Sequence, residues 1–324
     1  MTATARLFDA DGHDTPIDLG SGELPAPGER RLLWIDLDDR DAGTLGAIVT
    51  MLDISPRLLH RLVDAGSRPA LVQYPDHVHL SVRALDIGEG DHGGDQSGPR
   101  VLDLVAGKDW VLTVHDGPLP AIERILDGIE GETRLGALDA DGFLAAVVDS
   151  VIVGFYRVIE AIEGDIDRLD DAALHHRRGD DVLADIVAMR RRISRVRQAL
   201  TPHREAFAVL TRPDFALHDE LGKPWPGLLD RLEGAIDSAE GMRESLIGTY
   251  DVFMGREAQR DSRVVTTLTI LSAVLLPAVV LAGIMGMNFK LPFFDEPSNF
   301  WVAIGLMVAF AAAILGVARW RAWL

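Results

Sequence analysis

The side chain best placed to do chemistry is an amide, Asn288, which follows a long uncharged run. From Val264 to Met287 the chain has 24 residues without a charged side chain. As a helix rising ~1.5 Å per residue, this run crosses a hydrocarbon layer of roughly 30 Å. Mg²⁺ sheds its water reluctantly, and an amide oxygen accepts hydrogen bonds from that water. The sequence therefore predicts a water-mediated cation ligand at the mouth of a membrane span.

A second uncharged run, Phe300 to Ala318, follows closely, so the chain is expected to end in a two-helix membrane hairpin. Basic residues flank the side that both termini share: Arg256, Arg260, Arg263, Arg319 and Arg321. The connecting loop contains Lys290 and the acids Asp295 and Glu296. By the positive-inside rule, both termini are predicted to be cytoplasmic, in the inner (plasma) membrane, with the loop outside.

One hairpin cannot enclose a water-filled path, so conduction would need several copies around one axis. The first run carries threonines and Ser272, whereas the second is almost wholly apolar, so the first is predicted to line the path. Steps of three and four residues give the predicted pore stripe: Asp261, Val265, Leu268, Ser272, Leu276, Val279, Gly283 and Gly286. Bulky Leu268 and Leu276 would close such a path by dewetting.

Upstream of the spans, residues 1–140 read as a mixed α/β domain. Strands are expected at 30–37, 77–83, 100–106 and 110–114, the last two joined as a hairpin. In 77–83, alternation places Val78, Leu80 and Val82 on one face. Ser55 followed by Pro56 predicts the start of a helix.

From about residue 143 the apolar period becomes helical, with a break near 172–181 and a second helix up to Pro202. The first helix is acidic towards its end and the second carries five arginines, so an antiparallel hairpin would place opposite charges side by side. A third helix is predicted from Gly227 to Asn288. Glycines recur in it every seven residues: Gly227, Gly234, Gly241, Gly248 and Gly255. They predict a seam along which this helix packs closely against the hairpin. A further interpretation is that this seam rotates or slides as a signal passes to the membrane.

The composition and motifs of the chain argue against several classes of function. The net charge of −18 argues against nucleic-acid binding, and the absence of cysteine excludes disulfides and thiolate metal sites. The N-terminus lacks the pattern of a cleaved signal peptide. No hydrolase elbow or metalloprotease spacing is present, so an enzyme is not expected, and neither is an organic cofactor.

The segment 88–98 is rich in Gly and Asp and is expected to be a surface loop. Its alternative role is a cytosolic divalent-cation site, because carboxylate oxygens suit hard cations. The residues proposed for such a site are Asp86, Glu89 and Asp91.

Gly286-Met287-Asn288, placed after the first of two C-terminal spans, resembles the signature of the CorA family of divalent-cation channels. Pro277 within the span, Phe289 after the asparagine and the closing Arg319-Trp-Arg-Ala-Trp-Leu324 support the resemblance. The likeness of architecture covers essentially the whole chain, and that of motifs covers about 260–324.

The resemblance implies a homopentameric funnel. It also implies an ion filter, formed by a ring of Asn288 side chains, through which hydrated Mg²⁺, Co²⁺ and Ni²⁺ pass. It further implies closure by cytosolic Mg²⁺, which is then both substrate and gating ligand, and Asp230, Glu233 and Asp237 on the third helix are the candidate gating carboxylates. One departure is Lys290, where many relatives have an acid, with Asp295 and Glu296 only later. Two alternatives stay open: zinc transport within the superfamily, and a membrane-anchored scaffold or sensor that conducts nothing.

The expected fold is an α+β cytoplasmic domain in α/β/α layers, with a helical hairpin, a long stalk helix and two C-terminal transmembrane helices. The predicted boundaries are 1–140 for the α/β domain, 141–222 for the hairpin, 223–263 for the stalk, 264–288 for the first span, 289–299 for the loop, 300–320 for the second span and 321–324 for the tail.

Overall fold

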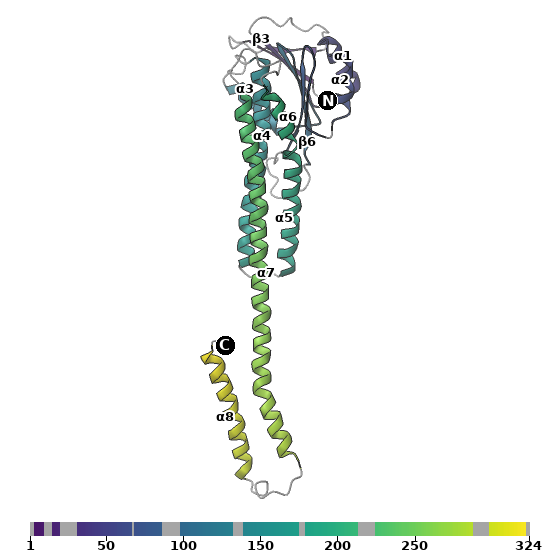
Figure 1. Ribbon diagram of the computed structural model, residues 1–324. Helices are drawn as coiled ribbons and strands as arrows, with labels where there is room; N and C mark the ends of the chain where they lie inside the picture. Colours follow the sequence, from purple (N-terminus) through teal and green to yellow (C-terminus); the bar gives the residue numbers. More distant parts are fainter. Residues whose placement is uncertain are drawn as a thin grey trace. The chain divides into compact units, whose positions relative to one another are not determined.

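The computed structural model describes residues 3–9, 15–19, 31–66, 68–85, 98–131, 139–174, 179–212, 224–287 and 298–321. The chain divides into two compact units, Met1–Thr249 and Tyr250–Leu324. The division falls inside one helix, α7 (Pro224–Met285), and Figure 1 draws the elements of both units.

Unit 1 is built on a seven-stranded sheet with the strand order β2-β1-β3-β7-β6-β5-β4. The strands are β1 (Ala3–Asp9), β2 (Thr15–Ile17), β3 (Arg31–Leu37), β4 (Ala70–Gln73), β5 (Val78–Ala84), β6 (Arg100–Ala106) and β7 (Trp110–His115). All neighbouring strands are antiparallel except β3 and β7, which pair in parallel with Leu33 opposite Trp110. The parallel pair joins the N-terminal strands to the β4–β7 meander.

Helices cover both faces of this sheet (Figure 1). On one face, α1 (Ala42–Met51) and α2 (Pro56–Val63) form a core with Leu33, Ile35 and Leu37 of β3. The Asp41 carboxylate caps α1 by accepting a hydrogen bond from Thr44 N at 2.8 Å, which holds the pKa of this carboxyl below its usual value.

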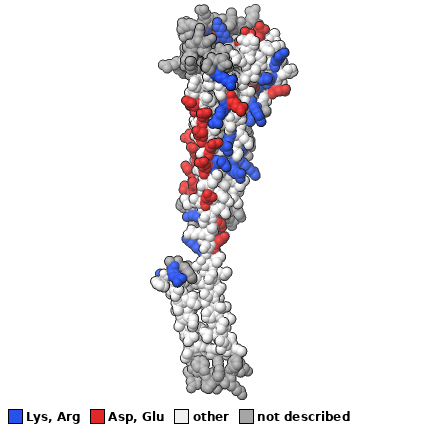
Figure 2. All heavy atoms as spheres, viewed as in Figure 1, with Lys and Arg blue, Asp and Glu red and all other residues white. Residues whose placement is uncertain are grey.

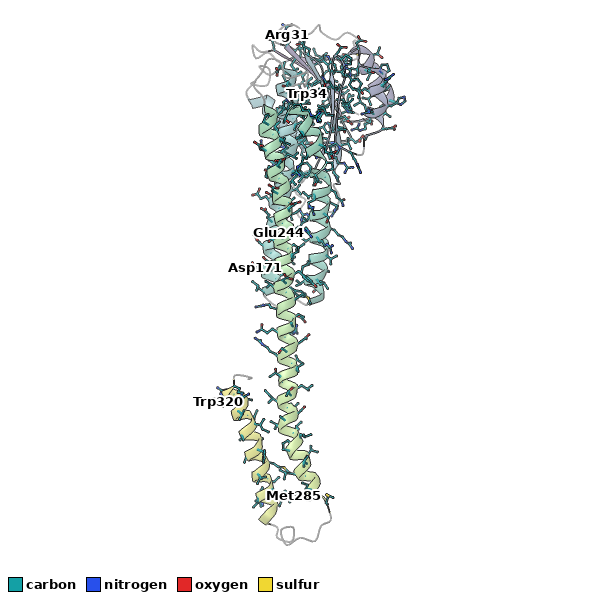
Figure 3. The ribbon with its side chains drawn as sticks, in the orientation of Figure 1. Arg31, Trp34, Asp171, Glu244, Met285 and Trp320 are labelled. Carbon is teal, nitrogen blue, oxygen red and sulfur yellow. The ribbon has the colours of Figure 1, made fainter. Side chains whose placement is uncertain are left out.

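On the other face lie α3 (Pro120–Gly131), α4 (Ala140–Leu174), α5 (Gly179–Leu200) and α6 (His203–Leu210). Trp34 of β3 packs against Phe143 of α4, with ring centroids 5.1 Å apart, and its indole N–H donates to the Thr113 hydroxyl at 3.0 Å. Figure 3 labels Trp34 in this interior, among the side chains between sheet and helices. The α/β/α layering is therefore as expected.

The predicted strands near 30–37, 77–83, 100–106 and 110–114 are confirmed, as is the hairpin between β6 and β7. The strands β1, β2 and β4 and the helices α3 and α6 were not predicted. Val78, Leu80 and Val82 share one buried face of β5 as predicted, and His79 and Ser81 on its second face are buried as well. Layers on both sides of the sheet are the reason.

The glycine repeat of α7 does not form the expected packed seam. Only at Gly234 would a Cβ meet a neighbour, the Tyr156 hydroxyl oxygen at 2.8 Å. At Gly227, Gly241, Gly248 and Gly255, no atom lies within 4 Å of that position in the part of the chain described. The buried residues of α7 in unit 1, such as Leu232, Ala239 and Leu246, lie on the other side of the helix.

Unit 2 contains the end of α7 and α8 (Ser298–Trp320). Both helices are long and apolar enough to cross a membrane, and only 6% of each apolar window is buried within the protein. Helix α4 is similarly long and apolar, but 67% of its window is buried, which marks it as a core helix of unit 1. The C-terminal helices thus expose apolar surface that lipid or a second copy of the chain would cover.

Candidate ion-conduction site

Each helix of unit 2 has one covered stripe. On α7 from residue 261 to the end of the helix, the partly or fully buried residues are Thr266, Ile270, Val274, Pro277, Ala278, Leu281 and Met285. On α8 they are Ala303, Met307, Ala311, Ile314 and Ala318. Both sets step by three and four residues, the spacing of one helix face, and Figure 1 draws α8 beside the end of α7. The two covered stripes are the faces through which the helices pack.

The predicted pore stripe lies on the other side of α7. Leu268 and Ser272 each lie two residues from the nearest covered positions, which is about 200° around a helix of 3.6 residues per turn. Leu276 is next to the covered Pro277 in sequence and lies two residues from Val274 and Ala278. Leu268 and Leu276 are 63% and 69% exposed, and Val265 and Val279 are 63% and 66% exposed. Asp261, Gly283 and Gly286 on the same stripe are exposed too. Sequence periodicity alone had not identified the face that α8 covers.

The threonine hydroxyls of the first apolar run are hydrogen-bonded within their own helix. The hydroxyls of Thr266, Thr267 and Thr269 donate to the carbonyl oxygens four residues earlier, at 2.8, 2.9 and 2.8 Å. Such bonds remove the cost of bringing a hydroxyl donor into an apolar layer. These threonines therefore need no partner outside their own helix.

Helix α7 ends one residue before the predicted filter. Gly286 N donates to Ala282 O at 2.9 Å and Met287 N to Ile284 O at 3.2 Å, which is a tightened last turn. Asn288 and the loop acids Asp295 and Glu296 lie outside the described residues, and so does Lys290. The structure thus places Gly286 and Met287 of the motif at the C-terminal end of the exposed stripe.

Comparison with known proteins decides the family. The family described as "CorA-like Mg2+ transporter protein" matches residues 29–317. The chain belongs to this CorA family. Its members are divalent-cation transporters, and the α+β domain, the long helix and the C-terminal apolar helices described above are the elements it shares with them.

The chain is 23% identical over 279 residues to the cobalt/magnesium transport protein CorA of Thermotoga maritima, covering 84% of this chain and 77% of that protein. It is 22% identical to the zinc transport protein ZntB of Photorhabdus laumondii, covering 98% and 92%. The solved CorA magnesium transporter of Methanocaldococcus jannaschii has the same fold, with a TM-score of 0.79 at 20% identity over 100% of this chain and 99% of that one. Because the chain is about equally identical to magnesium and zinc transporters, sequence identity does not distinguish between the two cations.

The residues proposed for the cytosolic sensor of this CorA chain are only partly described. Asp86, Glu89 and Asp91 lie outside the described residues. Glu233 forms an ion pair with Arg204 at 3.6 Å, and Asp230 and Asp237 are exposed on α7. Within the described ranges, no three metal-ligating side chains come together in one chain. A sensor built from these residues would need ligands from elsewhere.

The sheet of unit 1 contains a buried charge network that sequence reasoning missed. The Asp103 carboxylate, fully buried, accepts from Arg40 at 2.7 Å and contacts His79 Nε2 at 2.7 Å. Burial would raise the pKa of Asp103, but the His79 hydrogen bond and the Arg40 charge outweigh burial and lower it. Arg40 also donates to backbone oxygens of Leu62, Val101 and Val114. The network joins α2 to β6 and β7, and its role is structural.

Proposed function

We propose that the chain forms a homopentameric channel that admits hydrated Mg²⁺, and also Co²⁺ and Ni²⁺, across the inner membrane. One observation carries the proposal: on α7 the side opposite α8 is exposed along the whole described span. Copies arranged around an axis would turn this stripe inward and α8 towards lipid. The soluble unit and both termini would then be cytoplasmic, as the flanking arginines indicate.

The gate in this proposal consists of Leu268 and Leu276, two turns apart on the exposed stripe. Rings of leucine make a constriction that water leaves, and a hydrated divalent cation does not cross a dry constriction. Ser272 between them and Gly283 beyond them are small, so the path would be wider there. Opening would require the leucine rings to separate or rotate.

The filter is assigned to Asn288, with Gly286 and Met287 bringing it to the mouth. Amide oxygens hold the ion through its water, so the ion is selected without the cost of dehydration. Asp295 and Glu296 in the following loop would attract cations, and Lys290 would oppose them.

The filter is tested by measuring Mg²⁺ uptake into liposomes that contain purified protein. We expect Asn288→Ala to lower the flux, or its preference for Mg²⁺ over Na⁺, by at least about tenfold, the equivalent of one lost charge-assisted hydrogen bond. Asn299→Ala, which removes the same side chain at the start of α8, is the matched control and should leave flux unchanged. Equal flux in both variants would remove Asn288 from the filter.

Zinc is the second candidate cargo, because relatives named ZntB align over nearly the entire chain. Proton-coupled transport needs a titratable group within the span, and neither Val264–Met287 nor Phe300–Ala318 contains one. The runs also lack His and Cys, which favour Zn²⁺. Comparing Mg²⁺ and Zn²⁺ flux with and without a pH gradient separates the two, and absence of flux for both would indicate a non-conducting scaffold.

Feedback by cytosolic Mg²⁺ belongs to the same proposal. Asp230 and Asp237, exposed on one chain, would bind the ion together with carboxylates of a neighbouring copy, for which Asp86, Glu89 and Asp91 are the candidates. Binding between copies would hold the ring closed when internal Mg²⁺ is high.

A further inference from the structure

The outward face of α5 carries an unpaired basic surface. Arg190 and Arg191 are exposed, and neither has a hydrogen bond or ion pair within the described part of the chain. A shallow hollow of about 550 Å³ follows this face, lined by Val187, Arg190, Arg191, Ser194, Arg195 and Gln198. Exposed Leu183 and Val187 continue the face towards the start of the helix. Arginine beside exposed aliphatic side chains is typical of a protein interface.

The other arginines of α5 are already paired inside the chain. Arg192 bonds Asp165 of α4, and Arg197 lies 3.5 Å from Glu240 of α7. The pair of Arg192 with Asp165 is the predicted contact between the acidic and basic helices of the hairpin, which is therefore confirmed. Arg190 and Arg191 are exposed and have no such partner among the described residues.

An acidic surface lies on different helices of the same unit. Glu163 and Asp167 of α4 and Glu244 of α7 are exposed and, among the described residues, without an ion pair. The two helices are neighbours here, because the Tyr156 hydroxyl donates to Arg231 O at 2.8 Å. Figure 2 shows acidic side chains gathered along one side of this helical bundle and basic side chains along the other, and Figure 3 labels Asp171 and Glu244 on the acidic side.

The two surfaces stand at the same level along the bundle. Because Arg192 is opposite Asp165 and α5 runs antiparallel to α4, Arg190 and Arg191 are level with residues 166–167 of α4. Because Arg197 is opposite Glu240, Arg191 is level with about residue 246 of α7. Glu244 is two residues from that point, about 3 Å along the helix axis. Copies related by rotation about an axis parallel to the bundle would meet with these levels matched.

From these observations the geometry points to a second copy of this chain as the partner: the α5 face with Arg190 and Arg191 docks on Glu163, Asp167 and Glu244 of the next copy. The two surfaces differ and lie on different sides, so the contact is head-to-tail, the type of contact that closes into a ring when the rotation between copies is a whole fraction of a turn. The open positions at Gly241 and Gly248 let the arginine side chains lie close to the α7 backbone. The inference rests on the homo-oligomer of the proposed function and adds the contact that orders its cytosolic part.

The chain contains no cysteine, so single cysteines test the contact directly. Full-length protein carrying Arg191→Cys with one tag is coexpressed with Glu244→Cys carrying another tag, and the membranes are oxidised. We expect a disulfide between the two tagged copies. The control pairs Arg191→Cys with Asp230→Cys, which is exposed on the same face of α7 but about 21 Å away along the helix. Its cross-link should be at least about tenfold weaker, and equal yields would overturn the contact.

Charge exchange gives the second measurement. Arg190→Glu with Arg191→Glu should weaken association of the detergent-solubilised full chain on the order of tenfold, because two attractive charges become repulsive. Adding Glu163→Arg and Glu244→Arg should restore association, which a merely misfolded variant would not do. No restoration would contradict the contact.

The outcomes separate this inference from the proposed function. A wild-type chain that is monomeric and carries no cation would refute the proposed function itself. A chain that is oligomeric and conducts, but gives no cross-link between Arg191→Cys and Glu244→Cys, would refute only the contact. If no cross-link forms and Arg190→Glu with Arg191→Glu instead abolishes binding of the nanodisc-reconstituted protein to vesicles of anionic lipid, the basic surface serves lipid and the inference is wrong.

Discussion

At the scale of single residues, His203 is the group whose chemistry the fold changes most. Its ring is buried between Phe155 and Phe207, with centroids 5.8 and 5.7 Å away. Nε2 accepts a hydrogen bond from Arg83 N at 2.9 Å, and Nδ1 faces Leu200 O at 3.2 Å. Burial lowers the pKa of His203 to about 4. The neutral ring thereby ties the α5–α6 junction to β5.

This environment predicts acid sensitivity of unit 1. The pKa of His203 is about 4 in the folded chain and 6.5 in the unfolded chain, so between these values the unfolded chain binds more protons. The His203 contribution is therefore complete above pH 6.5 and is lost as the pH falls towards 4. Lowering the pH from 7 to 5 should reduce the free energy of unfolding by about 2 kcal/mol through this group.

The measurement is denaturant unfolding followed by the fluorescence of buried Trp34 and Trp225, in detergent, at both pH values. His203→Gln keeps an acceptor for Arg83 N but does not titrate, so it should lack this part of the pH dependence. His115 acts in the opposite direction: burial lowers its pKa, but the bond to Asp36 outweighs burial and raises it. Because His115 is present in both proteins, identical pH dependence of wild type and His203→Gln would exclude the assignment to His203.

At the scale of elements, the covered and exposed stripes of α7 predict a difference in access to water. Cysteine at Gly283, on the exposed stripe beyond the leucine gate, should react with a charged, membrane-impermeant thiol reagent at least about tenfold faster than cysteine at Leu281, because a charged reagent enters apolar surroundings only at a large cost. Both positions lie in one helix, two residues apart, and only Leu281 is on the covered stripe. Rates measured in proteoliposomes test the assignment, and faster labelling at Leu281 would place the water path beside α8.

Sequence periodicity was sufficient to predict the long helices, but it did not predict which face of a helix packs against which neighbour. The apolar runs predicted α4, α5, α7 and α8, since helices of that length leave a strong repeat. The strand β2 spans only three residues, Thr15–Ile17, which is too short for a repeat to appear. The glycine repeat of α7 was correctly read as one stripe but wrongly assigned to packing within the chain. Which face of a helix meets which neighbour depends on contacts between distant segments, and Tyr156 against Gly234 is one such contact.

At the candidate site, too, sequence patterns predicted local features but not contacts between residues far apart in the sequence. A motif of three residues and a count of uncharged positions predicted the span and its pore stripe. The network of Arg40, His79 and Asp103 was missed, because its members are 39 and 24 residues apart in sequence and meet only through strand pairing. The arginines of α5 were predicted to pair within the hairpin. Arg192 does so with Asp165 of α4, whereas Arg197 lies 3.5 Å from Glu240 of α7.

At the scale of the whole molecule, the charge is divided unevenly. The net charge is −18, yet the two apolar runs contain no charged side chain, so the negative charge belongs almost entirely to the soluble part. In a ring of identical copies these negatively charged parts repel one another. A divalent cation reduces such repulsion more effectively than monovalent salt, because it can bind carboxylates of two copies at once.

We therefore expect millimolar Mg²⁺ to stabilise the cytosolic part of the assembled protein. If Mg²⁺ binds only the folded ring, it adds about 2.7 kcal/mol to the free energy of unfolding when its concentration is 100 times its dissociation constant. Proteolysis through open states is then slower by roughly a hundredfold. The measurement is limited proteolysis of the full-length protein in detergent with Mg²⁺, against NaCl at matched ionic strength. Asp230→Asn with Asp237→Asn should lose the Mg²⁺-specific part of the protection if these carboxylates hold the ion, whereas Asp185→Asn, an exposed acid of α5, should retain it. Equal protection by NaCl would mean that the acidic surfaces respond only to screening, and cytosolic Mg²⁺ would then have no site through which to close the channel.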